Sequence, residues 1–158
     1  MNATNPSGVV HHAAPPMPAE PPLRARQYGH AGLIPFIIGT LLLWLVYPDL
    51  QPWVALGLAA YGAVIVSFLG GIHWGLAMSA GAPGQRAFGW AMVPPLVAWL
   101  ALVMPAHAGL VVLGVMLVVC YLMDRRLYLE KGMGAWLTLR FRLTVIAALC
   151  CFLGAAGT

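Results

Sequence analysis

The sequence predicts an all-α integral membrane protein, a bundle of five transmembrane helices with a cytoplasmic N-terminus and a periplasmic C-terminus. Of its 158 residues, 61% are hydrophobic and only 8% are charged. A soluble domain carries roughly 25% charged residues, so this chain cannot cover a compact particle with polar surface. The apolar residues also fall into five long segments. Such segments are helical in hydrocarbon, because every backbone donor must be paired internally.

The first 28 residues differ from the rest of the chain. We expect residues 1–28 to form a disordered, proline-rich cytoplasmic tail, and residues 29–158 to form the five-helix transmembrane domain. Proline lacks a backbone donor and has a fixed φ, so the tail favours neither helix nor central strand. Its prolines are Pro6, Pro15, Pro16, Pro18, Pro21 and Pro22. His11 and His12 lie in this flexible stretch and are not expected to hold a metal.

The five apolar segments set the order of the predicted helices. They cover about 32–47, 53–78, 88–104, 108–123 and 139 to the C-terminus. Several are near the lower bound of roughly 17 residues for crossing a bilayer core. The breaks at Pro48–Pro52 and Pro105–Gly109 are short, which predicts antiparallel helical hairpins. Pro35 falls in the first turn of the first segment, where its missing N–H costs little.

The third segment contains two adjacent prolines, Pro94 and Pro95. Neither has an N–H, so the carbonyls of Trp90 and Ala91 lose their usual helical donors. This predicts a kink in the third helix.

The basic residues predict the orientation in the membrane. If the tail is cytoplasmic and five helices follow, all eight basic residues fall on the cytoplasmic side, as the positive-inside rule requires. They are Arg24, Arg26, Arg86, Arg125, Arg126, Lys131, Arg140 and Arg142. An even number of helices would spoil this agreement. Seven arginines against one lysine suggest a GC-rich bacterial genome.

Small residues recur every four positions along the second segment. They are Ala55, Ala59, Ala63, Ser67, Gly71 and Gly75. Such a stripe lets helix backbones approach closely in lipid, which predicts that this helix lies at the centre of the bundle. The alternative is that the stripe is a seam for association with another chain.

Ionisable residues near the cytoplasmic ends of the helices form the candidate site. We expect His73, Asp124 and Arg140 to lie at one depth and to cluster, with Arg140 bonding Asp124 or an anionic headgroup. Alternatively, His73 is a structural hydrogen-bonding residue, and Asp124 ends the fourth helix within an interfacial cluster of charges. Tyr61, mid-membrane on the same helix as His73, completes the candidate set and is expected to bond a neighbouring backbone group.

No motif for catalysis or for a cofactor occurs in the sequence. Cys120, Cys150 and Cys151 lie in apolar runs and are expected to pack as small apolar residues. A bis-histidine haem would need two facing imidazoles, which His30 and His73 do not convincingly supply. The sequence therefore predicts no metal, no cofactor and no enzymatic activity.

Several motifs resemble the domain of unknown function 3429 family (transmembrane protein 69-like). They are Gly32-Leu-Ile-Pro35-Phe36, the run from Tyr61 to Gly75 that contains His73-Trp74, Ala98-Trp99, and Trp136-Leu-Thr-Leu-Arg140 through Leu143-Thr144. The resemblance covers residues 29–155. It implies a polytopic protein of bacterial inner membranes or mitochondria and brings no assigned reaction.

These observations predict a non-enzymatic inner-membrane protein, an accessory, assembly or scaffold subunit of a larger membrane complex. The alternative is a membrane protein that binds a small molecule, lipid or quinone in a pocket at its cytoplasmic end. The expected partners are the lipid bilayer, and other membrane subunits or a second copy of the chain. The eight basic residues are too few and too scattered for a nucleic-acid surface.

Overall fold

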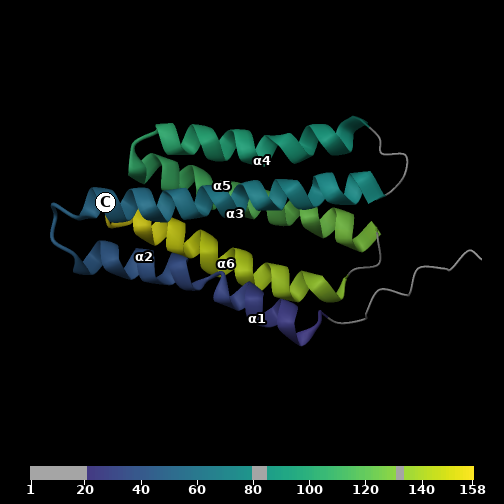
Figure 1. Cartoon of the computed structure of the whole chain (residues 1–158), viewed down its shortest axis with the longest axis horizontal. Coiled ribbons are helices and arrows are strands. Elements are labelled where there is room, and N and C mark those ends of the chain that lie inside the picture. The colour runs from purple at the N-terminus through teal and green to yellow at the C-terminus, as the bar shows by residue number, and fades with distance from the viewer. Residues whose placement is uncertain (1–20, 80–84, 131–133) are drawn as a thin grey trace, which may run out of the picture.

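A computed structural model of the chain describes residues 21–79, 85–130 and 134–158. These residues form six α-helices and no strand. The helices are α1 (Leu23–Ala31), α2 (Ile34–Leu45), α3 (Gln51–Ser79), α4 (Gln85–Val103), α5 (Ala106–Glu130) and α6 (Ala135–Ala156) (Figure 1).

Most of these helices are long and apolar enough to cross a membrane. The candidate spans are Leu23–Leu45 (α1 with α2), α3, Ala106–Leu129 in α5, and α6, and the apolar part of α4, Phe88–Val103, is shorter. At 1.5 Å per residue, the 29 residues of α3 reach about 43 Å, which exceeds a hydrocarbon core of about 30 Å. The predicted all-α membrane fold is confirmed.

The outer surface of the bundle is apolar. Large hydrophobic side chains point outward from every helix and are more than half exposed; examples are Trp44, Trp53, Val64, Leu100 and Leu149. A monomeric soluble protein rarely exposes a continuous apolar surface of this kind. Lipid is the solvent in which these side chains are stable.

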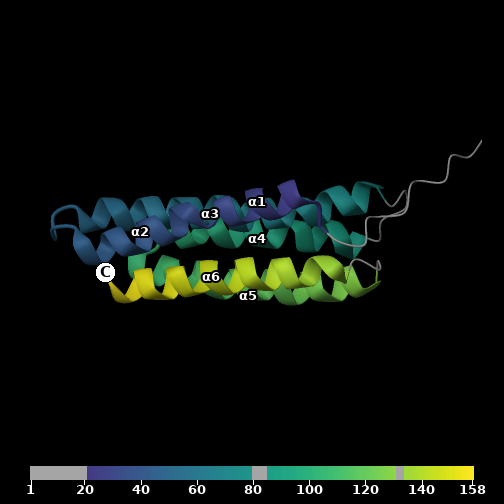
Figure 2. The same cartoon turned by 90° about the horizontal axis from the view of Figure 1, so that it is seen from below.

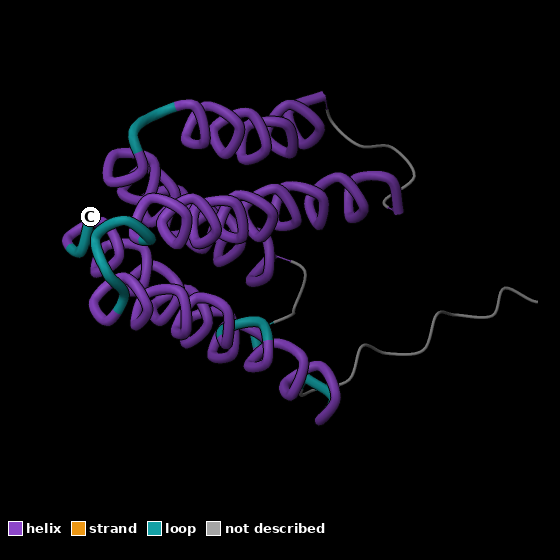
Figure 3. Tube along the Cα trace, turned by 60° about the vertical axis from the view of Figure 1, so that its left-hand side comes forward, coloured by secondary structure: helices purple, strands orange, loops and turns teal. Residues whose placement is uncertain are grey.

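The helices run along one long axis. Helices α3, α5 and α6 occupy the centre, α4 packs on α3 and α5, and α2 packs on α3 and α6 (Figure 1). Seen from below, α5 and α6 lie side by side (Figure 2). The α2–α3 and α4–α5 turns gather at the end that holds the C-terminus, and α1 begins at the opposite end (Figure 3). Both predicted hairpins are therefore present.

The core is made by α2, α3, α4, α5 and α6. Its fully covered residues include Leu43, Val66, Leu110, Leu113 and Cys151. All three cysteines are buried and free. A hydrogen bond joins α2 to α6, because the Thr40 hydroxyl donates to the carbonyl of Cys150 at 3.0 Å.

The predicted tail is corrected at its membrane end. Helix α1 begins at Leu23, so residues 23–28 are helical and not part of the tail. The last tail proline is Pro22, which lies just before the helix, where proline is tolerated. Pro35 lies in the first turn of α2, as predicted. The rest of the tail prediction, with His11 and His12, concerns residues 1–20, outside the described residues.

Helix α5 is longer than predicted. It continues through Asp124 to Glu130, because no proline or glycine follows Asp124 before residue 132. Asp124 therefore lies inside a helix and does not end one. Pro94 and Pro95 lie inside α4, which is continuous across them; the bend predicted there stays a prediction.

The stripe of small residues has two different halves. Ala55, Ala59 and Ala63 are buried in the bundle and Ser67 is half-buried. Gly71 and Gly75 are exposed, and a Cβ built on either would meet no atom within 4 Å. The prediction of one continuous packing stripe is therefore wrong for its last two residues, because positions four apart drift by about 40° per step around a helix with 3.6 residues per turn. The position of α3 at the centre of the bundle is confirmed.

Candidate functional site

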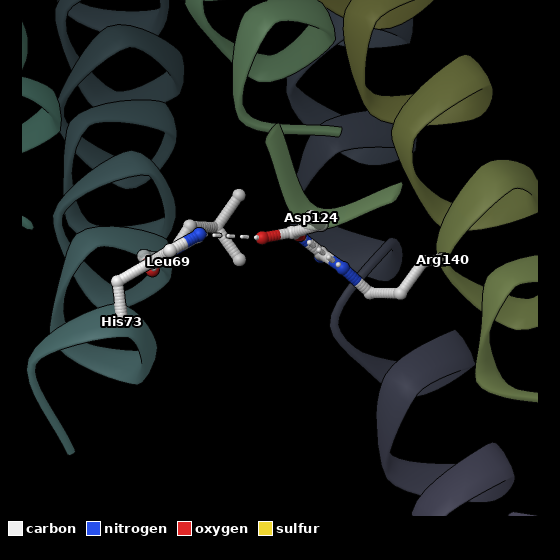
Figure 4. Close-up of polar contacts among 4 residues, drawn as sticks. All are labelled: Leu69, His73, Asp124 and Arg140. Carbon is white, nitrogen blue, oxygen red and sulfur yellow. Dashed lines mark hydrogen bonds and ion pairs between the residues drawn. The ribbon is translucent and has the colours of Figure 1, made fainter. Parts of the chain in front are cut away.

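Three ionisable side chains from the three central helices meet inside the bundle (Figure 4). The guanidinium of Arg140 donates from Nε to Asp124 Oδ2 at 2.8 Å, and its Nη2 bonds the same oxygen. On the other side, Nε2 of His73 lies 3.3 Å from Asp124 Oδ1. The carboxylate thus lies between two basic groups, one on α3 and one on α6.

The helix order along the chain explains the common depth of these residues. His73 lies near the C-terminal end of α3, Asp124 near that of α5, and Arg140 near the N-terminal end of α6. These ends lie on the same side of the bundle, where α1 also begins (Figure 1). Because α3 and α5 run in the same direction and α6 runs in the opposite one, their three side chains lie at one level.

Asp124 is the most buried ionisable residue of the site, with 1% of its surface exposed. The alternative of an interfacial charge cluster is therefore wrong for Asp124, although Arg125 and Arg126 beside it are exposed. A buried carboxylate loses several kcal/mol of hydration, which a partner must offset with charge and hydrogen bonds. Arg140 supplies both, and only 13% of its side chain is exposed.

His73 is buried, with 8% of its surface exposed, and faces an acceptor on each side of its ring. Its Nδ1 lies 3.2 Å from the carbonyl of Leu69, one turn earlier. Its Nε2 is close to Asp124 but not aligned for a hydrogen bond. The ring edge also contacts Trp90 of α4, with centroids 6.4 Å apart.

A cavity of about 400 Å³ opens beside this cluster, and Arg140 forms part of its wall. Its lining comes from α1, the α1–α2 joint, α2, α3, α5 and α6, and is mostly apolar. The lining residues are Ala25, Tyr28, Gly29, Gly32, Leu33, Phe36, Ile65, Phe68, Leu69, Ile72, Leu117, Tyr128, Trp136, Leu139, Arg140, Leu143, Thr144 and Ala147. The cavity therefore combines a long apolar wall with one charged side chain.

Tyr61 does not join the cluster, although the sequence grouped it with His73. Its hydroxyl donates to the carbonyl of Gly32 at 2.8 Å, which fastens α3 to the α1–α2 joint. The expected bond to a backbone group is present. Because Gly32 lines the cavity, Tyr61 supports the cavity wall from outside.

The candidate site predicted from the sequence leaves out three residues that surround the cluster. Trp90 contacts His73, and Tyr128 and Trp136 line the cavity. For two of them a signal was available, since Tyr128 follows Asp124 by four residues and Trp136 precedes Arg140 by four, which places each pair on one helix face. Among the described residues, no three His, Cys, Asp or Glu side chains are close enough to hold a metal ion.

Comparisons with known proteins point to one family. The family model described as protein of unknown function (DUF3429) matches residues 21–156. Transmembrane protein 69 of Xenopus tropicalis is 37% identical over 139 residues, which cover 80% of this chain and 51% of the frog protein. The chain thus spans about half the length of this curated relative. No solved structure matches the chain.

Proposed function

We propose that this chain, which belongs to the DUF3429 family of proteins of unknown function, is a non-enzymatic membrane protein that binds an amphiphilic molecule in the cavity beside Arg140. The observation that carries the proposal is the composition of the cavity wall. The wall is apolar over most of its length, and one charged side chain faces it at the level of the buried carboxylate.

The size and shape of the cavity support this function. About 400 Å³ lies within the range of small-molecule sites, which are mostly apolar with a few polar groups that orient the ligand. An acyl chain or an isoprenoid chain matches the apolar wall made by Phe36, Ile65 and Leu143. Asp124 has both oxygens engaged by basic groups, which supports a binding role for the cluster over proton abstraction.

The experiment is photo-crosslinking of the purified chain with a phospholipid that carries a diazirine on its acyl chain. We expect labelled peptides from the cavity wall, and loss of the label with excess unlabelled phospholipid. Ala25→Phe fills the cavity from α1 and should reduce labelling about fivefold or more. Ala31→Phe, on the exposed side of the same helix, is the matched control. Labelling that is spread over exposed residues such as Val64, and that excess unlabelled phospholipid does not reduce, would contradict the proposal.

A second candidate function is an accessory or scaffold subunit of a larger membrane complex. It is favoured by Gly71 and Gly75, which leave an open, side-chain-free strip on the lipid-facing surface of α3. Glycines four apart let a helix of another chain approach the backbone closely. Another membrane protein or a second copy of this chain fits such a strip.

Affinity purification in mild detergent tests this second function. A stoichiometric partner should remain bound to the wild-type chain and be lost from Gly71→Leu/Gly75→Leu. Gly57→Leu is the matched control, because Gly57 is also exposed on α3 with open space around it. A wild-type chain that elutes alone, or a partner retained by the double variant, would argue against the subunit role.

The membrane and the orientation are also proposals. Five passes, counting α4, place the start of α1 and the C-terminus at opposite ends, as the structure arranges them (Figure 1). The arginines of the described helices lie toward the end where α1 begins, which supports a cytoplasmic location for that end. We assign the chain to a bacterial inner membrane with its C-terminus in the periplasm.

A further inference from the structure

We infer that the molecule bound in the cavity carries an oxyanion, a carboxylate or a phosphate, and that Arg140 holds this head. The inference rests on the proposed binding function and specifies its ligand. It follows from the sign of the charged side chain in the cavity wall and from the basic residues beside Ala25 on α1.

The buried cluster has more basic groups than acidic ones. Asp124 supplies one carboxylate, while Arg140 bonds one of its oxygens and His73 faces the other. Asp124 is already paired with Arg140, so the cluster has no free carboxylate that a cationic head could bind. The charged group that lines the cavity is basic, and its chemical complement is an anion.

Arg140 is the basic group of the cluster that lines the cavity. His73 and Asp124 are covered, whereas Arg140 lines the cavity wall. Its contacts with Asp124 use Nε and Nη2, and the planar guanidinium has five N–H donors in all. The donors that remain are suited to a second oxyanion, because guanidinium binds carboxylates and phosphates with charge-assisted bonds.

The surface around the α1 wall of the cavity adds to this preference. Ala25 lines the cavity, and its neighbours Arg24 and Arg26 are exposed on the same short helix. Basic residues that flank a pocket between transmembrane helices are typical of sites for anionic lipid heads. A neutral head would gain little from these charges.

Competition between matched amphiphiles tests the inference. The purified wild-type chain is labelled with the diazirine phospholipid, and the label is displaced by oleate or by oleyl alcohol, which differ only in the head. A second pair, phosphatidic acid and diacylglycerol, differs only in a phosphate. We expect the anionic member to compete about tenfold better in at least one pair. The pair that shows the preference identifies the source, a fatty acid or a phospholipid.

Two variants connect the preference to the cluster. Arg140→Gln should remove most of the preference for the anion. His73→Gln should weaken it about threefold, because Arg140 is then the one basic group beside Asp124 and is held more tightly by that carboxylate. Arg142→Gln is the control, since Arg142 is exposed on the same helix and outside the cavity lining. Should Arg140→Gln fail to fold, Arg140→Lys keeps the charge and is expected to retain the preference. The inference is then tested by His73→Gln and by the competition between the paired amphiphiles on the wild-type chain.

The outcomes separate this inference from the proposed function. Equal competition by both members of each pair in the wild-type chain would overturn the inference and leave the binding function standing. A preference that persists in both Arg140→Gln and His73→Gln would also overturn it. Failure of all four amphiphiles to displace the label would instead refute binding in the cavity.

Discussion

Gly70 of α3 and Ala91 of α4 are in direct backbone contact. A Cβ built on Gly70 would lie 2.6 Å from the carbonyl oxygen of Ala91 and 3.0 Å from Cδ of Pro95. Pro95 is also the residue that leaves this carbonyl without its helical donor, since proline has no N–H. The carbonyl is therefore covered by the Cα–H groups of a glycine, a weak donor that recurs at close helix contacts. The pair explains how α4 stays helical across two prolines beside α3.

Replacement of Gly70 should destabilise the bundle more than replacement of its neighbour. Gly70→Ala inserts a methyl group where Ala91 and Pro95 leave no room, and we expect a loss of about 1–3 kcal/mol. Gly71→Ala should leave the stability nearly unchanged, because a Cβ there meets nothing within 4 Å. Thermal unfolding of the detergent-solubilised chain compares the two variants. Equal melting temperatures would show that α3 and α4 are not in close contact.

Removal of the buried carboxylate should be costly because it leaves Arg140 uncompensated. For Asp124→Ala we expect a loss of about 3–5 kcal/mol, measured by unfolding in mixed micelles. Replacing both partners, Asp124→Leu with Arg140→Met, should recover much of that loss, since no buried charge remains. Arg125→Ala, at an exposed position next to Asp124, should stay within about 0.5 kcal/mol of wild type. A double variant less stable than Asp124→Ala would contradict the ion pair.

The Tyr61 hydroxyl should hold the α1–α2 joint against α3. Tyr61→Phe removes its bond to the Gly32 carbonyl and should cost about 0.5–1.5 kcal/mol. Because Arg24 and Arg26 lie on α1, loosening of the joint should speed tryptic cleavage after these residues. Tyr47→Phe, at an exposed position, is the control. An unchanged cleavage rate in Tyr61→Phe would mean that the bond does not restrain α1.

The proposed orientation predicts where a C-terminal fusion is active. In a bacterial host, alkaline phosphatase fused after Thr158 should be active, because it folds productively only in the periplasm. Green fluorescent protein at the same position should be dark. Fusions placed in the α2–α3 turn, after Asp49, should behave in the same way, since that turn lies at the same end of the bundle as the C-terminus (Figure 3). The reverse pattern would refute the odd number of passes or the cytoplasmic tail.

The positions of helices and breaks could be predicted because they depend on local properties. Pro48 and Pro105 mark the hairpins, Pro35 marks the first turn of α2, and the apolar segments match the helices within a few residues at most ends. The errors arose where composition misleads. Leu23–Tyr28 looked like tail because prolines precede them, and Asp124 looked like a helix end because charged residues follow it. Neither a preceding proline nor a run of charges prevents a helix from forming.

The amino-acid sequence is sufficient to show that the solvent of this chain is lipid, and that His73, Asp124 and Arg140 lie at one depth, because hydrophobicity and the helical rise act along the chain. The sequence does not show the lateral contacts between helices, since the depth of a residue does not say which helix it faces. Only the packing of the helices against one another placed Asp124 between His73 and Arg140, buried Ala55 while it exposed Gly75, and left a cavity beside Arg140. These relationships depend on the fit of side chains from distant segments, which no local pattern encodes.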